Sequence, residues 1–499
     1  MAPAPEMVRA MSKNAAALSW TLLWAILVIT GLTLRPLLPV DETRYASVAW
    51  EMWLHGDYLV PYLNGETYSH KPPLLFWLMN ASWLLFGVND WTHRLIAPLF
   101  GLASLFLTSR IAERLWPDSQ AKVAAPLLLL AGIFWATFST LTMFDMMVAT
   151  WTLVGMLGLI EAWRGRSGLG WTLFALAIGL GVLSKGPVIL VFLLPAALAA
   201  PYWTKGAKPA GTWGAWYLKI LLATLAGAAI ALAWAIPAGI SGGEAYRNAI
   251  FWGQSAGRVV DSFAHRKPIY WYLAILPPML LPWLLWPSFW RAVWRGLTNL
   301  RQRSGGVADH GTRLIAIWVG VPFVIFSLVS GKAPHYLLPF LPAIAIAAAI
   351  GIERTPNGAR ALRQALPLAV LGVMIVVTIH LGANARLKDA YDLKPLAEKL
   401  AGYERDGYAI AHYGNYHAQF QFLGRLTQNI EEIGDGEPTW LREHPKAKVI
   451  AYRYALPDGV TPDYVQKFRG RYAVIWDGKD VIANQAIARR DGRAQDDDD

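Results

Sequence analysis

The stretch that decides the fold is residues 18–45, LSWTLLWAILVITGLTLRPLLPVDETRY. Its first part, Leu18 to Leu34, carries no charge, and a helix needs about 20 mostly apolar residues to cross a bilayer. Arg9 and Lys13 precede this run, and no small-residue cleavage site follows it. We therefore interpret the run as a retained first membrane helix rather than a cleaved signal peptide.

The composition of the whole chain agrees with a membrane protein. Only 16% of the 499 residues are charged and 55% are apolar, whereas a soluble domain carries about 25% charged residues. The chain has no Cys, which excludes disulfides, iron–sulfur clusters and thiol nucleophiles. These figures predict one large helical membrane body with a small polar appendage, and they exclude a disordered, fibrous or soluble globular chain.

Further apolar runs extend this pattern along the chain. Together with the first helix they predict a polytopic α-helical membrane protein with about 11 transmembrane helices. The ten further spans are expected at 93–114, 123–140, 143–163, 170–185, 186–202, 215–240, 268–290, 312–330, 335–352 and 365–383. The run Leu74 to Phe86 is too short to span and follows two prolines, so we expect it to lie in the membrane interface.

The net charge of +11 has two explanations, a nucleic-acid partner or a membrane orientation. If the N-terminus is cytoplasmic, strict alternation of the spans places 17 Lys and Arg residues inside and nine outside. This distribution satisfies the positive-inside rule. The basic excess therefore indicates orientation in a bacterial inner membrane, and no nucleic-acid partner is expected.

Two domains are predicted from this arrangement. Residues 1–383 form the membrane domain, whose periplasmic loop at 37–92 carries interfacial helices. Residues 384–499 form a small periplasmic α/β domain, because an odd number of spans places the C-terminal segment outside. Its strand-like stretches, separated by Gly, Pro and Asp turns, are residues 408–412, 448–452 and 472–476.

Acidic residues fall at the outer ends of these helices. Asp41 and Glu42 begin an amphipathic interfacial helix, where a carboxylate acts either as a general base or only as a charge placed against the helix dipole. Asp145 lies among apolar residues, where an isolated carboxylate is energetically costly and is expected to have a function or an ionic partner. The structural alternative is that Asp145 is a polar cap in a turn between two helices. Two acidic residues on one face indicate either that both take part in general-base catalysis or that they hold a divalent metal through oxygen ligands.

Cations collect on the same side. Lys71, just before Pro72-Pro73, is expected to contact a substrate phosphate or to extend toward lipid headgroups. Acidic and basic residues at the outer ends of the membrane helices are suited to an amphiphilic substrate, with a phosphate at the interface and a hydrocarbon tail in the bilayer. The helix centres are nearly free of charge, which argues against a transporter.

Several motifs carry a resemblance to a known family. They are DETRY at 41–45, GDYLVP at 56–61, HKPP at 70–73, SKGP at 184–187, FAHRKP at 263–268 and KAPHYLLP at 332–339. Over about residues 15–350 the chain resembles the polytopic glycosyltransferases of GT-C fold, especially the bacterial aminoarabinose (lipid A) transferases and protein O-mannosyltransferases, glycosyltransferase families 39 and 83.

This resemblance implies an integral-membrane glycosyltransferase. Such an enzyme moves a sugar from a polyprenyl (undecaprenyl) phosphate donor to a periplasmic lipid or glycan acceptor, here lipid A, lipopolysaccharide or a related glycan, by direct displacement with inversion. Membrane lipids are its other partners. The alternatives are a protein acceptor, as in O-mannosyltransferases, and a flippase or transporter of lipid-linked sugars.

The resemblance also implies roles for single residues. Asp41 corresponds to the acid that serves as base or positions the acceptor, and Lys71 is similar to the lysine that meets the donor phosphate. The catalytic candidates are Asp41, Glu42 and Asp145. The candidates for binding the donor phosphate are Lys71, Arg258, Arg266, Lys332 and Tyr336.

One position departs from the family pattern. Aminoarabinose transferases have an acid immediately before the motif lysine, and this chain has His70 there. The sequence assigns no cofactor. A divalent metal remains an alternative to metal-free chemistry, with His70 and His265 as its candidate ligands.

Overall fold

The computed structural model describes residues 12–205, 209, 211–257, 267–301, 309–434, 439–457 and 459–484. The chain divides into two compact units. The first, here the membrane unit, comprises Met1–Gly31, Arg94–Pro237 and Asn248–Thr378. The second, here the sheet unit, comprises Leu32–His93, Ala238–Arg247 and Ile379–Asp499. The loop after the first helix thus belongs to the same unit as the C-terminal segment.

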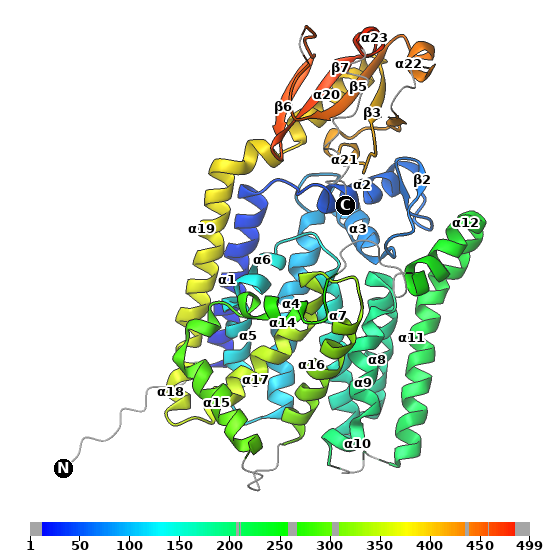
Figure 1. Ribbon diagram of the computed structural model, residues 1–499. Coiled ribbons are helices and arrows are strands. Elements are labelled where there is room, and N and C mark those ends of the chain that lie inside the picture. Colours follow the sequence, from blue (N-terminus) through cyan, green and yellow to red (C-terminus); the bar gives the residue numbers. More distant parts are fainter. Residues whose placement is uncertain are drawn as a thin grey trace, which may run out of the picture. The chain divides into compact units, whose positions relative to one another are not determined.

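The membrane unit is built from helices (Figure 1). Its first half contains α1 (Lys13–Leu34), η1 (His93–Leu95), α4 (Ile96–Leu115), α5 (Ala121–Ala131), α6 (Ile133–Phe138), α7 (Asp145–Trp163), α8 (Ser167–Lys185), α9 (Val188–Leu198), α10 (Ala200–Trp203) and α11 (Trp213–Ser241). Its second half contains η2 (Ala249–Gly257), α14 (Trp271–Met279), η3 (Trp283–Leu285), α15 (Pro287–Arg301), α16 (His310–Leu328), η4 (Pro334–Phe340), α17 (Leu341–Glu353), α18 (Gly358–Leu362) and most of α19 (Ala365–Tyr391). Helices α1, α11 and α19 continue beyond the bounds of this unit at Gly31, Pro237 and Thr378.

The polytopic helical fold class is confirmed, and eight helices in the described part of the chain are long and apolar enough to cross a membrane. Three of the eleven expected spans are divided into shorter helices. The 123–140 run divides at Gly132, the 186–202 run divides after Leu198, and the 268–290 run forms α14, η3 and the start of α15. Proline residues lie within or beside all three, and a proline removes a backbone donor that a continuous helix needs.

Helices α7 and α8 form a close antiparallel pair joined by a short turn (Figure 1). Glycines make this approach possible: a Cβ atom at Gly158 would lie 2.6 Å from the carbonyl oxygen of Gly170. Small residues allow helix backbones in membranes to approach in this way. Because the two helices are antiparallel, the start of α7 lies beside the end of α8, which determines the position of Asp145.

The sheet unit contains the interfacial helices and a five-stranded sheet. Its elements are α2 (Asp41–His55), β1 (Tyr62–Leu63), β2 (Glu66–Thr67), α3 (Leu74–Phe86), α12 (Gly243–Asn248), α20 (Lys394–Arg405), β3 (Ala409–Tyr413), α21 (Gln421–Gly424), β4 (Glu431–Ile433), α22 (Thr439–Glu443), β5 (Ala447–Arg453), β6 (Tyr464–Phe468), β7 (Arg471–Asp477) and α23 (Gly478–Ala483). The strand order is β4-β3-β5-β7-β6. Strand β3 runs parallel to β4 and β5, whereas β7 is antiparallel to β5 and β6.

The three predicted strands are confirmed as β3, β5 and β7, and the predicted short helix is confirmed as α3. Strands β4 and β6 at the two edges of the sheet were not predicted. In each of these strands, about half of the residues or more are exposed to solvent. Their sequences therefore lack the continuous apolar run that identifies the central strands.

Hydrogen bonds tie the 41–67 region to the C-terminal segment within the sheet unit. The indole of Trp50 donates to the carbonyl of Leu426 at 2.8 Å. The Asn64 amide both donates to the Ile430 carbonyl and accepts from the Ile430 amide, each at 2.8 Å. Burial raises the pKa of Glu51, although its carboxylate accepts from the amide of Gly65 at 3.0 Å. These buried polar contacts hold the two segments together in a fixed register.

Candidate functional site

Asp41 is the first residue of α2, where the helix dipole favours a negative charge. Its side chain is 53% exposed. One carboxylate oxygen, Oδ1, accepts from the Tyr45 hydroxyl at 3.1 Å and lies 3.3 Å from Arg44 Nη2. Within the described residues, the other oxygen has no hydrogen-bond partner. Asp41 therefore presents a positioned carboxylate that remains accessible.

Glu42, the adjacent acid, has a different environment. It is buried, and its two oxygens form a salt bridge with the two terminal nitrogens of Arg35. The same carboxylate accepts from the Leu38 amide at 2.9 Å. These bonds hold the 35–42 segment in shape, so the contacts of Glu42 favour a structural role over proton transfer.

Lys71 and His70 lie between β2 and α3. Lys71 is half-buried, and His70 is exposed with its ring centroid 5.3 Å from that of Tyr68. Pro72 and Pro73 follow, and Pro73 is the N-cap residue of α3. Because proline fixes its own backbone φ, this pair limits how far Lys71 can move relative to α3.

A second cluster lies in the membrane unit and brings together Asp145, Lys185 and Tyr336. Asp145 is the first residue of α7 and is buried, and Lys185 is the last residue of α8. The Lys185 ammonium donates to Asp145 Oδ1 at 2.6 Å and lies 4.8 Å from the centroid of the Tyr336 ring. Both charges sit at the helix end that their sign favours.

This ion pair explains how an apolar region holds a carboxylate. Removing a charge from water is costly unless it is paired and hydrogen-bonded. His335 extends the cluster, because its ring lies 5.0 Å from that of Tyr336 and 6.0 Å from that of Phe138. Lys185 is not among the site residues predicted from the sequence. Its position at the end of an apolar helix, before Gly-Pro, was the available signal.

Lys332 is buried, and its contacts are to backbone groups. Its ammonium donates to the carbonyl of Lys267 at 3.0 Å and to the carbonyl of Val329. Burial lowers the pKa of Lys332. The side chain thus joins the 267 region to the turn after α16, which positions the chain just before Tyr336.

The metal alternative stays a prediction, because one of its two candidate ligands lies outside the described residues. Arg258, His265 and Arg266 lie outside the described residues. Among the residues that are described, no group of three or more His, Asp or Glu side chains could hold a metal ion. His70 is exposed and packs against an aromatic ring.

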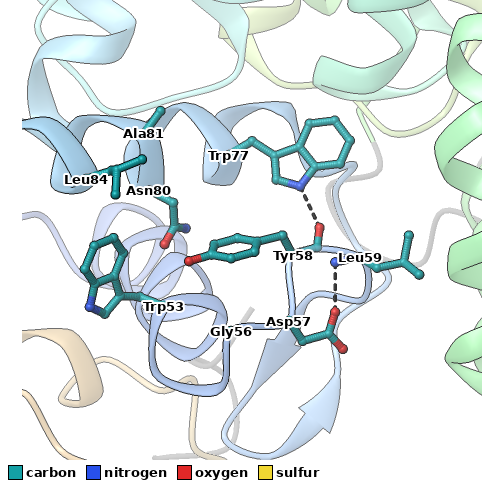
Figure 2. Close-up of a pocket in the computed structure, with 9 residues that line it drawn as sticks. All are labelled: Trp53, Gly56, Asp57, Tyr58, Leu59, Trp77, Asn80, Ala81 and Leu84. Carbon is teal, nitrogen blue, oxygen red and sulfur yellow. Dashed lines mark hydrogen bonds between the residues drawn. The ribbon is translucent and has the colours of Figure 1, made fainter.

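A pocket of about 730 Å³ lies between the end of α2 and α3 (Figure 2). Its polar groups are used locally: the Trp77 indole donates to the Tyr58 carbonyl at 2.7 Å, and the Asp57 carboxylate accepts from the Leu59 amide at 2.8 Å. The mostly aromatic and aliphatic lining is suited to an apolar group. The lining residues are Trp53, Gly56, Asp57, Tyr58, Leu59, Trp77, Asn80, Ala81 and Leu84.

Known families and proteins resemble this chain in sequence. A profile of the family described as dolichyl-phosphate-mannose-protein mannosyltransferase matches residues 70–237. The undecaprenyl phosphate-alpha-4-amino-4-deoxy-L-arabinose arabinosyl transferase of Erwinia tasmaniensis is 30% identical over 73% of this chain and 65% of its own length. The corresponding transferase of Pseudomonas aeruginosa is 30% identical over 71% of this chain and 63% of its own. The chain thus matches slightly less than two thirds of the length of these relatives.

Solved structures share the fold. The crystal structure of ArnT from Cupriavidus metallidurans bound to undecaprenyl phosphate superposes with a TM-score of 0.72 at 18% identity, covering 93% of this chain and 98% of that one. The oligosaccharyltransferase of Archaeoglobus fulgidus gives a TM-score of 0.54 at 13% identity, covering 85% of this chain and 65% of that one. The apolar helices and these relatives indicate a multi-pass protein of the bacterial inner membrane. The chain has the GT-C fold, and its sequence is similar to those of the aminoarabinose transferases and, over residues 70–237, to the protein mannosyltransferase family.

Proposed function

We propose that this chain transfers a sugar from undecaprenyl phosphate to a lipid A-type acceptor on the periplasmic side of the membrane. The observation that carries the proposal is the 30% identity, over more than 70% of the chain, to transferases named for an undecaprenyl phosphate-linked aminoarabinose. A protein of the same fold was crystallised with undecaprenyl phosphate bound. The cytoplasmic N-terminus and periplasmic site rest on the distribution of Lys and Arg.

The reaction is a direct displacement. An acceptor oxygen forms a bond to the anomeric carbon while the bond from that carbon to the phosphate oxygen breaks and its electron pair remains on undecaprenyl phosphate. Asp41 orients the acceptor and, when the acceptor is a hydroxyl, takes its proton. Its exposure and its single hydrogen-bonded oxygen suit this role, because a general base must reach the group that it deprotonates.

Lys71 is proposed to stabilise the departing phosphate as negative charge develops on it. An ammonium held near the position of that charge stabilises the transition state more than the ground state, and this difference lowers the activation barrier. Arg258 or Arg266 would assist it, as the family resemblance implies. In the membrane unit, Asp145 fixes the Lys185 ammonium beside Tyr336, so that Lys185 is a positioned cation of that unit.

A reconstituted transfer assay tests this proposal. Purified protein in proteoliposomes receives radiolabelled undecaprenyl-phosphate sugar and, in separate reactions, lipid A and an acceptor peptide rich in Ser and Thr. Label that becomes covalently attached to lipid A supports the proposal, and label on the peptide indicates an O-mannosyltransferase-type acceptor instead. Movement of donor across the bilayer without a covalent product would identify a flippase. Full activity in both Asp41→Asn and Lys71→Ala proteins would overturn the residue assignment.

A further inference from the structure

The turn between β6 and β7 is fixed at the edge of the sheet. Arg469 and Gly470 both have positive φ angles, 48° and 79°, which is the geometry of a tight two-residue hairpin. The Arg469 guanidinium donates to the carbonyl of Pro39, and its amide donates to the carbonyl of Ala390 at 3.1 Å. The hairpin is thereby attached to the segment that leads into Asp41, within the sheet unit.

Arg471, the first residue of β7, carries a buried charge. It is 8% exposed, and its guanidinium carbon lies 5.5 Å from the ring centroid of Tyr452 and 5.8 Å from that of Tyr454. Its Nε atom is sealed from solvent without a hydrogen-bond partner. Across the described ranges, no hydrogen bond or salt bridge reaches the Arg471 guanidinium. A buried cation without an anion is costly.

Two other cations of the sheet unit with little solvent exposure, Lys448 and Arg35, are paired with carboxylates. Lys448 lies 2.5 Å from Asp463 and 3.1 Å from Asp477, and Arg35 pairs with Glu42. Among the described residues, Arg471 contacts the faces of two tyrosine rings, which attract a cation but leave its N–H donors unused. The described residues thus leave the Arg471 guanidinium available to an external anion.

Two neighbours of Tyr452, Gln419 and His412, are neutral. Tyr452 accepts a hydrogen bond from the Gln419 side chain at 2.8 Å, and its ring lies 5.5 Å from that of His412. Burial lowers the pKa of His412 to about 4, so the imidazole is uncharged at neutral pH. An anion entering beside Arg471 would therefore meet hydrogen-bonding groups and aromatic rings rather than a competing charge from these two neighbours.

The topology places Arg471 at the edge where ligands bind in related folds. Strand β3 lies between β4 and β5 and is parallel to both, so the strand order reverses at β3. In open α/β sheets, ligands bind outside the carboxyl ends of the strands at such a switch point. Strand β5 ends at Arg453, opposite Tyr472, and antiparallel β7 begins at the same edge with Arg471.

We propose that Arg471, between Tyr452 and Tyr454, binds a phosphate group of the acceptor lipid. The planar guanidinium presents paired N–H donors that match phosphate oxygens, and a charge-assisted contact of this kind is among the strongest hydrogen bonds. The inference rests on the proposed function, because it assumes that the acceptor is an anionic lipid. It adds an acceptor-binding site in the C-terminal sheet, attached through Arg469 and Pro39 to the segment before Asp41.

A binding experiment without donor tests the site. The full-length protein is placed in phosphatidylcholine nanodiscs, and the binding of fluorescent lipid A is compared with that of enzymatically dephosphorylated lipid A. We expect Arg471→Gln to weaken binding of the phosphorylated lipid by about 10- to 100-fold, and Arg471→Lys to weaken it less. Binding of the dephosphorylated lipid should change little. Arg442→Gln, at an exposed arginine on α22 of the same domain, is the matched control and should bind as the unmodified protein does.

Several outcomes would overturn the proposal. Equal preference for the phosphorylated lipid in the unmodified and Arg471→Gln proteins would exclude a phosphate contact. Equal competition by inorganic phosphate or phosphatidic acid would show a general phosphate site rather than an acceptor site. A large fall in melting temperature in Arg471→Gln, without phosphate-dependent stabilisation of the unmodified protein, would assign Arg471 a structural role.

The design also separates this inference from the proposed function. Since no donor is present, a protein that transfers no sugar can still show Arg471-dependent binding. Conversely, sugar transfer that proceeds with an unchanged KM for lipid A in Arg471→Gln would overturn this site while supporting the transferase activity.

Discussion

Two carboxylates, each at the first residue of a helix, occupy opposite environments. Asp145 in the membrane unit is buried and bonded to Lys185 at 2.6 Å, beside the ring of Tyr336. Asp41 in the sheet unit is half exposed, and its contacts with Tyr45 and Arg44 are longer, at 3.1 and 3.3 Å. The same local position in a helix therefore produces a locked charge in one unit and an available charge in the other.

The difference shows what each acid can contribute. In an apolar region a carboxylate must have its cation, so Asp145 serves mainly to hold Lys185 in place. At an exposed helix start the dipole stabilises the charge and water solvates it, so Asp41 can exchange partners during a reaction. The comparison predicts that changes at Asp41 affect turnover, whereas changes at the Asp145–Lys185 pair affect stability first.

The largest effect is expected from Asp41→Asn. It removes the proposed base while preserving size and hydrogen bonding, so kcat should fall by about 10²- to 10⁴-fold. The melting temperature of the Asp41→Asn protein should stay within about 2 °C of that of the unmodified protein, because exposed charge pairs contribute little to stability. Transfer kinetics and thermal unfolding measure both quantities. Glu66→Gln, at an exposed position of β2, is the control. If the Asp41→Asn protein turns over at nearly the rate of the unmodified protein, Asp41 is not the base.

The next effect concerns Lys185→Met, which leaves the Asp145 carboxylate buried without its cation. Breaking a buried pair from one side costs about 3–5 kcal/mol of unfolding free energy. The double variant Asp145→Asn with Lys185→Met should recover most of this loss, because no uncompensated charge remains. Denaturant unfolding in detergent measures the coupling. If the double variant is as unstable as the sum of the single variants, the pair is not coupled as described.

Asp309 provides an intermediate case at the start of α16. It caps the helix through the Thr312 amide at 2.7 Å and also accepts from Trp116 and Arg354. Burial alone would raise the pKa of Asp309, but these hydrogen bonds outweigh it and lower the pKa to about 2. Because this value lies below the unfolded one, the stabilisation is fully present above about pH 4 and is lost as the pH falls toward 2.

Asp309→Asn should therefore cost about 1–2 kcal/mol at neutral pH and flatten the dependence of stability on pH between 4 and 2. Melting curves recorded across this range provide the measurement. An unchanged slope between the variant and the unmodified protein would show that Asp309 does not titrate as its contacts require.

The smallest effect is expected at Tyr336. Tyr336→Leu removes the ring beside the Lys185 ammonium and should cost about 0.5–1 kcal/mol from the cation–π contact alone. Tyr336→Phe keeps the ring and should retain this stability, so the two variants separate the ring from the hydroxyl. If Tyr336→Phe loses transfer activity at unchanged stability, the hydroxyl takes part in donor binding.

Much of the fold could be predicted because its signals are local. Long uncharged runs identify membrane helices, and alternating apolar stretches identified β3, β5 and β7. The divided helices were harder to predict, since the effect of Gly132 or of a proline depends on the neighbouring packing. Edge strands such as β4 were missed because exposed residues carry little apolar signal.

The candidate site was predictable only in part. Asp41 and Asp145 stood out because charges are rare in this chain, but their environments could not be read from the sequence. In the sequence Glu42 is equivalent to its neighbour, whereas in the structure it is bonded to Arg35 and to the Leu38 amide. The pairing of Asp145 with Lys185 depends on the antiparallel contact of α7 and α8, which is a tertiary property.

The discontinuity of the sheet unit has a consequence for biosynthesis. Roughly 285 residues lie between its early segment, ending at His93, and its last segment, beginning at Ile379. At a synthesis rate of about 5–20 residues per second, the early segment waits roughly 15–60 s for its partner. During that interval Trp50 and Asn64 lack the backbone groups of Leu426 and Ile430. Nascent chains thus need protection of α2 by a chaperone or by the lipid surface, and a protein truncated before Ile379 should be a substrate for quality-control proteases.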